Sequence, residues 1–155
     1  TRNLDMSCII PIKRDQLSVF IRVAHHLLYA GCDVVLFVSL GSYDDRVDVT
    51  NRYNTSRDTH GTRHGYFARA NEVQLSQKII LIQLKVNNTL DSDKEQWRKT
   101  RLMLLHIGTF YAHTQWYVKI DTDTLFIPSN FRAFLINSNF TVLKEYYIGH
   151  VLSHT

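Results

Sequence analysis

Residues 7–39 read SCIIPIKRDQLSVFIRVAHHLLYAGCDVVLFVS, and this stretch decides the fold class. The run 7–12 is short and apolar, as a buried strand is. Between 17 and 29 the apolar residues recur at helical spacing, and Gly31 is a typical helix end. The apolar run 33–39 is typical of a buried parallel strand. Strand, helix and strand predict a right-handed βαβ unit, and therefore an α/β fold with a mostly parallel sheet flanked by helices.

Basic residues follow the first predicted strand. Lys13 and Arg14 come at its carboxyl end, where α/β enzymes contact nucleotides. The alternative is a solvated basic pair that opens the next helix, for which Asp15 is a candidate N-cap.

Outside this unit, the segment Gly41–Gln77 is long and polar. Structureless loops of that length are uncommon, so we expect either a loop that includes a short helix near Phe67–Ser76 or a loop that is mobile and functional. Beyond it, apolar runs alternate with helical patterns. The expected elements are a strand at 78–84, a helix at 93–112 with capping-box spacing at Ser92 and Glu95, a strand at 116–120, a helix at 128–137 and a strand at 145–151.

The stretch Trp116–Thr124, WYVKIDTDT, carries the strongest functional signal. A short apolar strand runs directly into Asp121 and Asp123, which are separated by Thr122. In open α/β sheets, ligands bind outside the carboxyl ends of the strands. Carboxylates at positions i and i+2 of a turn suit a hard cation such as Mg²⁺ or Mn²⁺. The alternative is a polar turn after a strand.

The order of motifs from Trp97 to Gly149 resembles the β1,3-glycosyltransferases related to the core 1 O-glycan galactosyltransferase and to Fringe. In that family a W-K-T helix precedes W-[FY]-x-K-x-D-D-D-T, an N-L-x-x-L helix and a Y-[FY]-x-G strand. Residues 8–40 match more loosely. Two departures stand out: Thr122 replaces the middle Asp of the triplet, and the sequence stops at Thr155, before the family's G-G-A-G-Y segment, catalytic base and second metal ligand.

The resemblance implies a GT-A-type, Rossmann-like domain, of which residues 1–155 are the nucleotide-sugar-binding portion, truncated at the C-terminus. It implies transfer of a sugar from a UDP donor with inversion, and galactose onto O-linked N-acetylgalactosamine is the leading interpretation. Asp123 would bind Mn²⁺ or Mg²⁺, and Asp121 would contact the ribose or the water shell of the metal. Such a portion is expected to bind nucleotide weakly and not to turn over.

Other site residues follow from the same resemblance and from position. Lys119 would support the aspartates or the uridine pocket, although a structural role fits equally. Thr122 would orient the loop, and Lys13 and Arg14 would contact the nucleotide. Trp97 and Lys99 are expected to pack their helix under the aspartate loop.

Cys8 and Cys32 are expected at one edge of two adjacent parallel strands, at a separation compatible with a disulfide. Two free buried thiols fit the sequence as well. The resemblance implies the Golgi lumen and a type II membrane protein with its anchor N-terminal to this chain, which favours the bridge. Sequons at Asn54, Asn87 and Asn139 are consistent with that route.

Composition sets broad limits. The chain is 45% hydrophobic and 21% charged, as ordinary globular proteins are. Its net charge of +4 favours an anionic ligand, but the basic residues are scattered, so no nucleic-acid surface is predicted. No apolar run reaches the roughly 18–20 residues of a membrane span. None of the paired histidines predicts a metal site; they are His25 with His26, His60 with His64, and His106 with His113.

Two other classes of function fit parts of the pattern. A phosphatase of the haloacid dehalogenase type also uses Asp-x-Asp after a buried strand, as nucleophile and acid/base. Such enzymes generally carry Gly-Thr after the second Asp, whereas Thr124 follows Asp123 directly. A non-catalytic relative that acts as a binding or chaperone-like protein is the other class.

Overall fold

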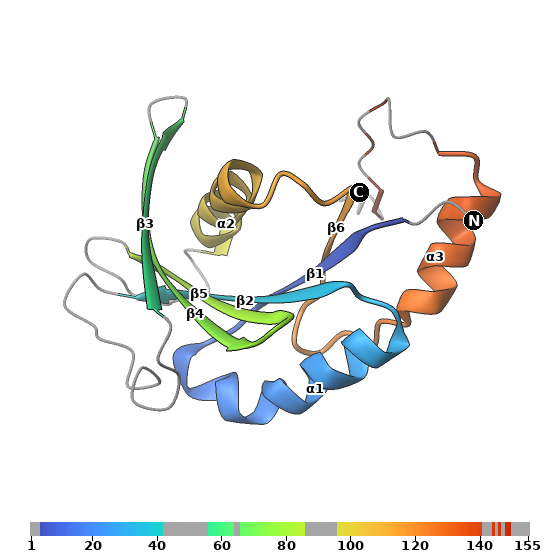
Figure 1. Cartoon of the computed structure of the whole chain (residues 1–155), viewed down its shortest axis with the longest axis horizontal. Coiled ribbons are helices and arrows are strands. Elements are labelled where there is room, and N and C mark those ends of the chain that lie inside the picture. Colours follow the sequence, from blue (N-terminus) through green and yellow to red (C-terminus); the bar gives the residue numbers. More distant parts are fainter. Residues whose placement is uncertain are drawn as a thin grey trace, which may run out of the picture.

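The computed structural model describes residues 4–41, 56–63, 66–85, 96–140, 144, 146, 148 and 149. They form an α/β fold (Figure 1). The elements in chain order are β1 (Met6–Pro11), the 3₁₀ turn η1 (Arg14–Gln16), α1 (Leu17–Ala30), β2 (Val34–Gly41), β3 (Ser56–Arg63), β4 (Tyr66–Ser76), β5 (Ile79–Lys85), α2 (Gln96–Phe110), β6 (Trp116–Lys119) and α3 (Pro128–Asn137).

The strands make one six-stranded sheet in the order β3-β4-β5-β2-β1-β6. Strands β5, β2, β1 and β6 are parallel, as the apolar runs predict. Strand β4 pairs antiparallel with β5, and β3 pairs antiparallel with β4. The strand β1 lies between β2 and β6, with Cys8 opposite both Val35 and Val118.

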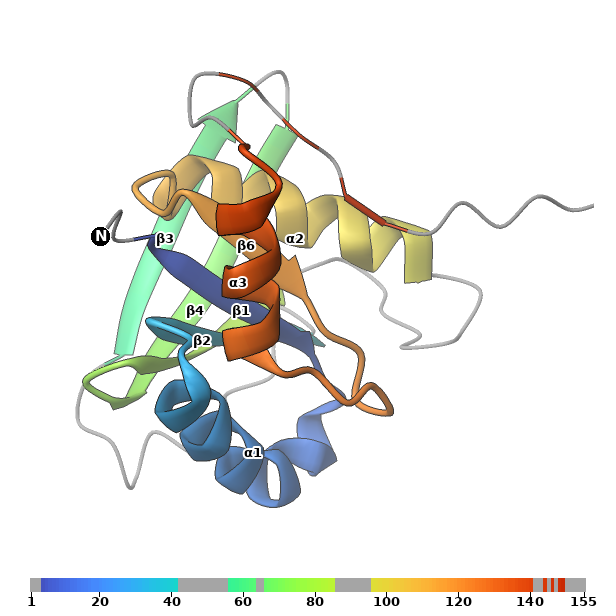
Figure 2. The same ribbon diagram turned by 90° about the vertical axis from the view of Figure 1, so that its right-hand side faces the viewer.

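Helices cover both faces of the sheet (Figure 2). Because strand side chains alternate, Ile10 of β1 packs with Ala24 and Leu27 of α1, and Phe131 of α3 packs against the same cluster. The neighbouring residue Ile9 faces the opposite side, where α2 supplies most of the helical contacts. The sheet is therefore buried between α1 and α3 on one face and α2 on the other.

The start of α1 differs from the expectation. Gln16 is the N-cap of α1, and Asp15 lies inside the 3₁₀ turn, so the prediction of Asp15 as N-cap is wrong. The turn is closed by the side chain of Gln16, whose Oε1 accepts a hydrogen bond from the Lys13 backbone N–H at 2.9 Å. At the other end Gly31 has φ +123°, and its N–H donates to the carbonyls of Leu27 and Leu28. Gly31 ends α1 as predicted.

The predicted loop with a helix near Phe67–Ser76 is wrong in the described part of Gly41–Gln77. Residues 56–63 and 66–76 form the β3–β4 hairpin, and 42–55 and 64–65 lie outside the described residues. Both faces of β4 are covered, with Ala70 on the α2 side and Val73 and Leu75 on the α1 side. Burial of both faces removes the simple alternation by which a polar strand is recognised.

In the carboxyl-terminal third of the chain, both predicted helices are present and the last predicted strand is not seen in its described residues. Helix α3 ends at Asn137 as predicted, and α2 ends at Phe110, two residues before its predicted end at 112. Ser92 and Glu95 lie outside the described residues. The predicted strand at 145–151 is wrong for its described residues 146, 148 and 149, which are not in a strand. Tyr146 instead packs its ring on Trp116 and Phe140, with centroids 6.3 and 4.7 Å away.

Two ties hold the amino ends of the strands. A disulfide joins Cys8 of β1 to Cys32, with a Cα–Cα distance of 6.0 Å, which confirms the predicted bridge. Arg132 of α3 donates to the Gly31 carbonyl through Nε at 2.9 Å and to Asp33 Oδ2 through Nη2 at 2.6 Å. Within the described ranges, none of the helices has the length and apolar character needed to span a membrane.

Candidate functional site at the ends of β1 and β6

The strand order reverses at the boundary between β1 and β6. The chain leaves β1 through α1 to reach β2 on one side, and later enters β6, on the other side of β1, from α2. Because α1 and α2 lie on opposite faces, the connections diverge here. Such a topological switch point is where open α/β sheets bind ligands, outside the carboxyl ends of the strands.

The residues predicted from sequence fall at this edge. After β1, Ile12 is buried and hydrogen-bonded to the Val38 carbonyl, and Lys13 is exposed. Arg14 opens η1, and its side chain lies outside the described part. After β6, the Ile120 N–H donates to the Ile9 carbonyl at 2.8 Å, which fixes the end of β6 beside β1. The loop with both aspartates leaves the sheet from this fixed point.

The aspartate loop is a closed turn on the surface. The Thr124 N–H donates to the Asp121 carbonyl oxygen at 3.0 Å. Asp121, Thr122, Asp123 and Thr124 are all exposed, and the Asp121 side chain is 59% accessible. Both carboxylates are therefore open to water and to a ligand.

Lys119 lies beside the first aspartate of the loop. Its Nζ donates to Asp121 Oδ1 in a close ion pair. Lys119 is the last residue of β6 and stands opposite Ile9 in the register, so its side chain emerges on the α2 face of the sheet. The ammonium group thus compensates the charge of one of the two carboxylates.

Lys99 of α2 is a second amine at this edge. Its Nζ donates to the Ile12 carbonyl at 3.1 Å, just past the end of β1. The structure therefore gives Lys99 a contact with the β1 end, whereas the prediction placed it under the aspartate loop; the Trp97 side chain lies outside the described residues. No sequence signal identifies this contact, because 87 positions separate the two residues.

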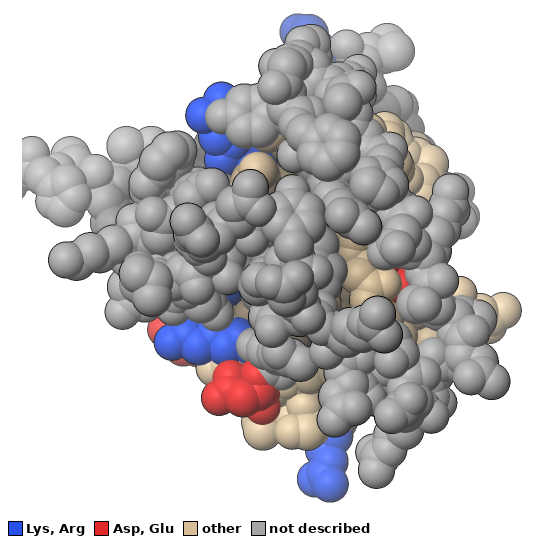
Figure 3. Space-filling view, turned by 90° about the vertical axis from the view of Figure 1, so that its left-hand side faces the viewer, with Lys and Arg blue, Asp and Glu red and all other residues tan. Residues whose placement is uncertain are grey.

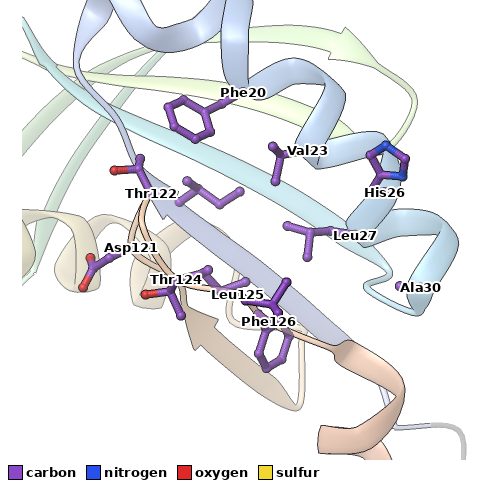
Figure 4. Close-up of a pocket in the computed structure, with 12 residues that line it drawn as sticks. Phe20, Val23, His26, Leu27, Ala30, Asp121, Thr122, Thr124, Leu125 and Phe126 are labelled. Carbon is purple, nitrogen blue, oxygen red and sulfur yellow. The ribbon is translucent and has the colours of Figure 1, made fainter.

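A pocket opens between α1 and the loop 121–126 (Figure 4). Its volume is about 290 Å³, and its walls are mainly apolar, with Phe20 and Leu27 of α1 facing Phe126. His26, Thr122 and Thr124 add polar groups. The sequence predicts a surface or packing role for His26 and gives no sign of the pocket. The sign appears only in the structure, where Val23 of the same helix is an exposed apolar residue.

Asp121 belongs both to the lining of the pocket and to the ion pair with Lys119. Figure 4 shows the Asp121 side chain directed away from the apolar walls, and Lys119 emerges on the α2 face. Elsewhere, on the face seen in Figure 3, the described charged residues lie apart in small groups and form no continuous basic stripe. The loop itself carries two exposed carboxylates, and the Lys119 ammonium lies beside one of them.

Asp121 and Asp123 present exposed carboxylates, which are the type of ligand that hard divalent cations take in proteins. Mg²⁺ and similar ions commonly use one or two protein carboxylates and complete their coordination with water and substrate phosphates. The described residues contain no group of three or more His, Cys, Asp or Glu side chains placed to share a metal ion. A cation at this turn would therefore take most of its ligands from water and from a bound phosphate.

Comparison of the chain with models of protein families, with curated proteins and with solved structures found no match. The function is therefore inferred from the residues and from the geometry of this edge.

Proposed function

We propose that this chain is the nucleotide-sugar-binding portion of a GT-A-type glycosyltransferase that transfers a sugar from a UDP donor to an acceptor hydroxyl. The observation that carries the proposal is the position of Asp121 and Asp123. They follow β6 directly, at the switch point beside the end of β1. This is where a nucleotide binds in open α/β sheets, and the resemblance of residues 116–124 to the family motif supports the same site.

Each residue has a role in this proposal. Asp123 and Asp121 would hold Mn²⁺ or Mg²⁺, which neutralises the developing charge of the departing diphosphate. The exposed amine of Lys13, with Arg14 next to it in sequence, would attract the phosphates or the nucleotide. Thr122 lies between the two carboxylates in the closed turn and would help to hold the loop for the donor.

The finer assignment follows the sequence resemblance. We infer galactose transfer, with inversion, to O-linked N-acetylgalactosamine on a protein, in the Golgi lumen, by a type II membrane protein. The Cys8–Cys32 disulfide supports an oxidising compartment, because disulfides persist there and are rare in the cytosol.

The first test is calorimetric titration of UDP into the chain with and without Mn²⁺. We expect weak binding that requires Mn²⁺ and falls at least about tenfold in Asp123→Asn, because the variant loses a charged ligand of the cation. Asp5→Asn is the matched control. Asp5 is exposed at the amino end of β1, at the opposite edge of the sheet, so its substitution should leave binding unchanged.

Two results would contradict the proposal. One is UDP binding that is indifferent both to Mn²⁺ and to Asp123→Asn. The other is a covalent aspartyl-phosphate on Asp121 after incubation with a phosphate monoester, which would identify the phosphatase chemistry instead.

A further inference from the structure

Lys119 contacts Asp121, one of the two carboxylates proposed to hold the cation. Its Nζ contacts Asp121 Oδ1, so this carboxylate already has a positive partner. The backbone of Lys119 is held in place, because Lys119 is paired with Ile9 in the sheet and the next residue, Ile120, is hydrogen-bonded to the Ile9 carbonyl. The ammonium group is not held by burial, since 37% of the side chain is accessible.

The ion pair has little value for stability. Both side chains are exposed, and exposed ion pairs contribute little to the free energy of folding because solvent screens them and ordering two side chains costs entropy. A flexible lysine with its ammonium on a candidate metal ligand instead affects binding. A divalent cation that approaches Asp121 meets a like charge and must displace it.

We propose that Lys119 is an internal counter-ion that competes with the divalent cation for Asp121, and that cation binding releases its ammonium to the diphosphate of the donor. The inference rests on the proposed function. A cation bound at Asp121 and Asp123 would bring the phosphates next to the loop, within reach of a four-carbon lysine stem. Lysine binds phosphate as a mobile point charge, so the same group can serve both partners in turn.

The inference predicts effects of opposite sign from one substitution. Lys119→Met should bind Mn²⁺ about two- to fivefold more tightly, because the competing charge is gone. At saturating Mn²⁺ the same variant should bind UDP at least about threefold more weakly, because the phosphates lose a cationic partner. A purely structural lysine would not separate the two affinities in this way.

The experiment is a titration of the 155-residue chain with Mn²⁺, in which electron paramagnetic resonance measures the unbound ion, followed by calorimetry with UDP. Lys119→Arg keeps the charge and should stay close to the wild type for Mn²⁺. Lys78→Met is the matched control, since Lys78 is exposed at the amino end of β5, on the opposite edge of the sheet. It should change neither affinity.

The outcomes separate the two levels of the proposal. Equal or weaker Mn²⁺ binding by Lys119→Met than by the wild type would overturn the role of Lys119 and leave the metal site in place. Unchanged UDP binding at saturating Mn²⁺ would overturn the release of the ammonium to the diphosphate. Absence of Mn²⁺ binding by the wild type and by Lys119→Met would overturn the metal site itself.

Discussion

At the scale of single residues, the pair His106–Glu72 is a test of the packing between α2 and the hairpin. His106 is fully buried, its Nε2 lies 2.9 Å from Glu72 Oε1, and its Nδ1 has no partner among the described residues. Glu72→Ala should lower the free energy of unfolding by about 1–3 kcal/mol, because it leaves a buried imidazole without its hydrogen bond.

Urea unfolding monitored by circular dichroism measures this loss. Glu72→Gln keeps an acceptor and should recover part of it. Gln74→Ala, at an exposed position two residues along the same strand, should stay within about 0.5 kcal/mol of the wild type. An equally small effect of Glu72→Ala would mean that the pair does not support the packing of α2.

Contacts between residues close in the chain can be predicted from sequence, and contacts between distant residues cannot. Asp121, Asp123 and Lys119 are predictable because they are neighbours in the chain, and the contact of Lys119 with Asp121 spans only two positions. The contact of Lys99 with the end of β1 joins residues that are distant in sequence. The bond between His106 and Glu72 does so too, so His106 could be predicted as a packing residue but its partner could not.

At the scale of elements, two glycines differ in their need for glycine: the backbone conformation of Gly31 requires it, and the helical conformation of Gly108 does not. Gly31 ends α1 with φ +123°, and a Cβ added there would lie 3.4 Å from Arg132 Nε. Gly108 lies inside α2, and a Cβ added there would meet no atom of the described residues within 4 Å apart from its own helix backbone. Gly31→Ala should therefore destabilise the protein by about 1 kcal/mol or more, and Gly108→Ala should stabilise it by roughly 0.5–1 kcal/mol.

Thermal and urea unfolding of the two variants check this pair, with each substitution serving as the control for the other. Equal effects of both substitutions, of either sign, would contradict the reasoning. They would mean that the addition of a methyl group, and not the backbone conformation of Gly31, sets the change in stability.

The elements that sequence predicts are those with a simple pattern. Continuous apolar runs correctly predict β1, β2 and β5, since central parallel strands are buried on both faces. The β3–β4 hairpin is not predicted, because β4 has polar residues among the apolar ones. One of them, Glu72, is paired with His106, which is distant in sequence. A strand whose polar residues are paired at long range has a sequence that resembles a loop.

At the scale of the whole molecule, the two edges of the parallel sheet have different content. The amino edge carries the disulfide and the bonds of Arg132 to Gly31 and Asp33. The carboxyl edge carries the exposed aspartate loop. Since β1 runs from one edge to the other, covalent and hydrogen-bonded ties at the amino edge can fix the strands while the loops at the other edge stay open to a ligand.

The disulfide allows this division to be tested. Cys8 and Cys32 are 24 positions apart, and closing a loop of that length stabilises a protein by about 3 kcal/mol, chiefly through the entropy of the unfolded chain. The variant with both Cys8→Ala and Cys32→Ala should lose about that much free energy of unfolding. The folded variant should keep the Mn²⁺ and UDP binding proposed for the chain, because the carboxyl edge is unchanged.

Urea unfolding with and without dithiothreitol measures the first effect, and calorimetry at a temperature where the variant is folded measures the second. Dithiothreitol should lower the midpoint for the wild type and leave the double variant unchanged, which separates loss of the bridge from loss of the two buried sulfur atoms. If the double variant kept its stability but lost affinity, the bridge would act on the site and not on the fold. The amino and carboxyl edges would then be coupled through β1, and the separation of stability from binding along this strand would be wrong.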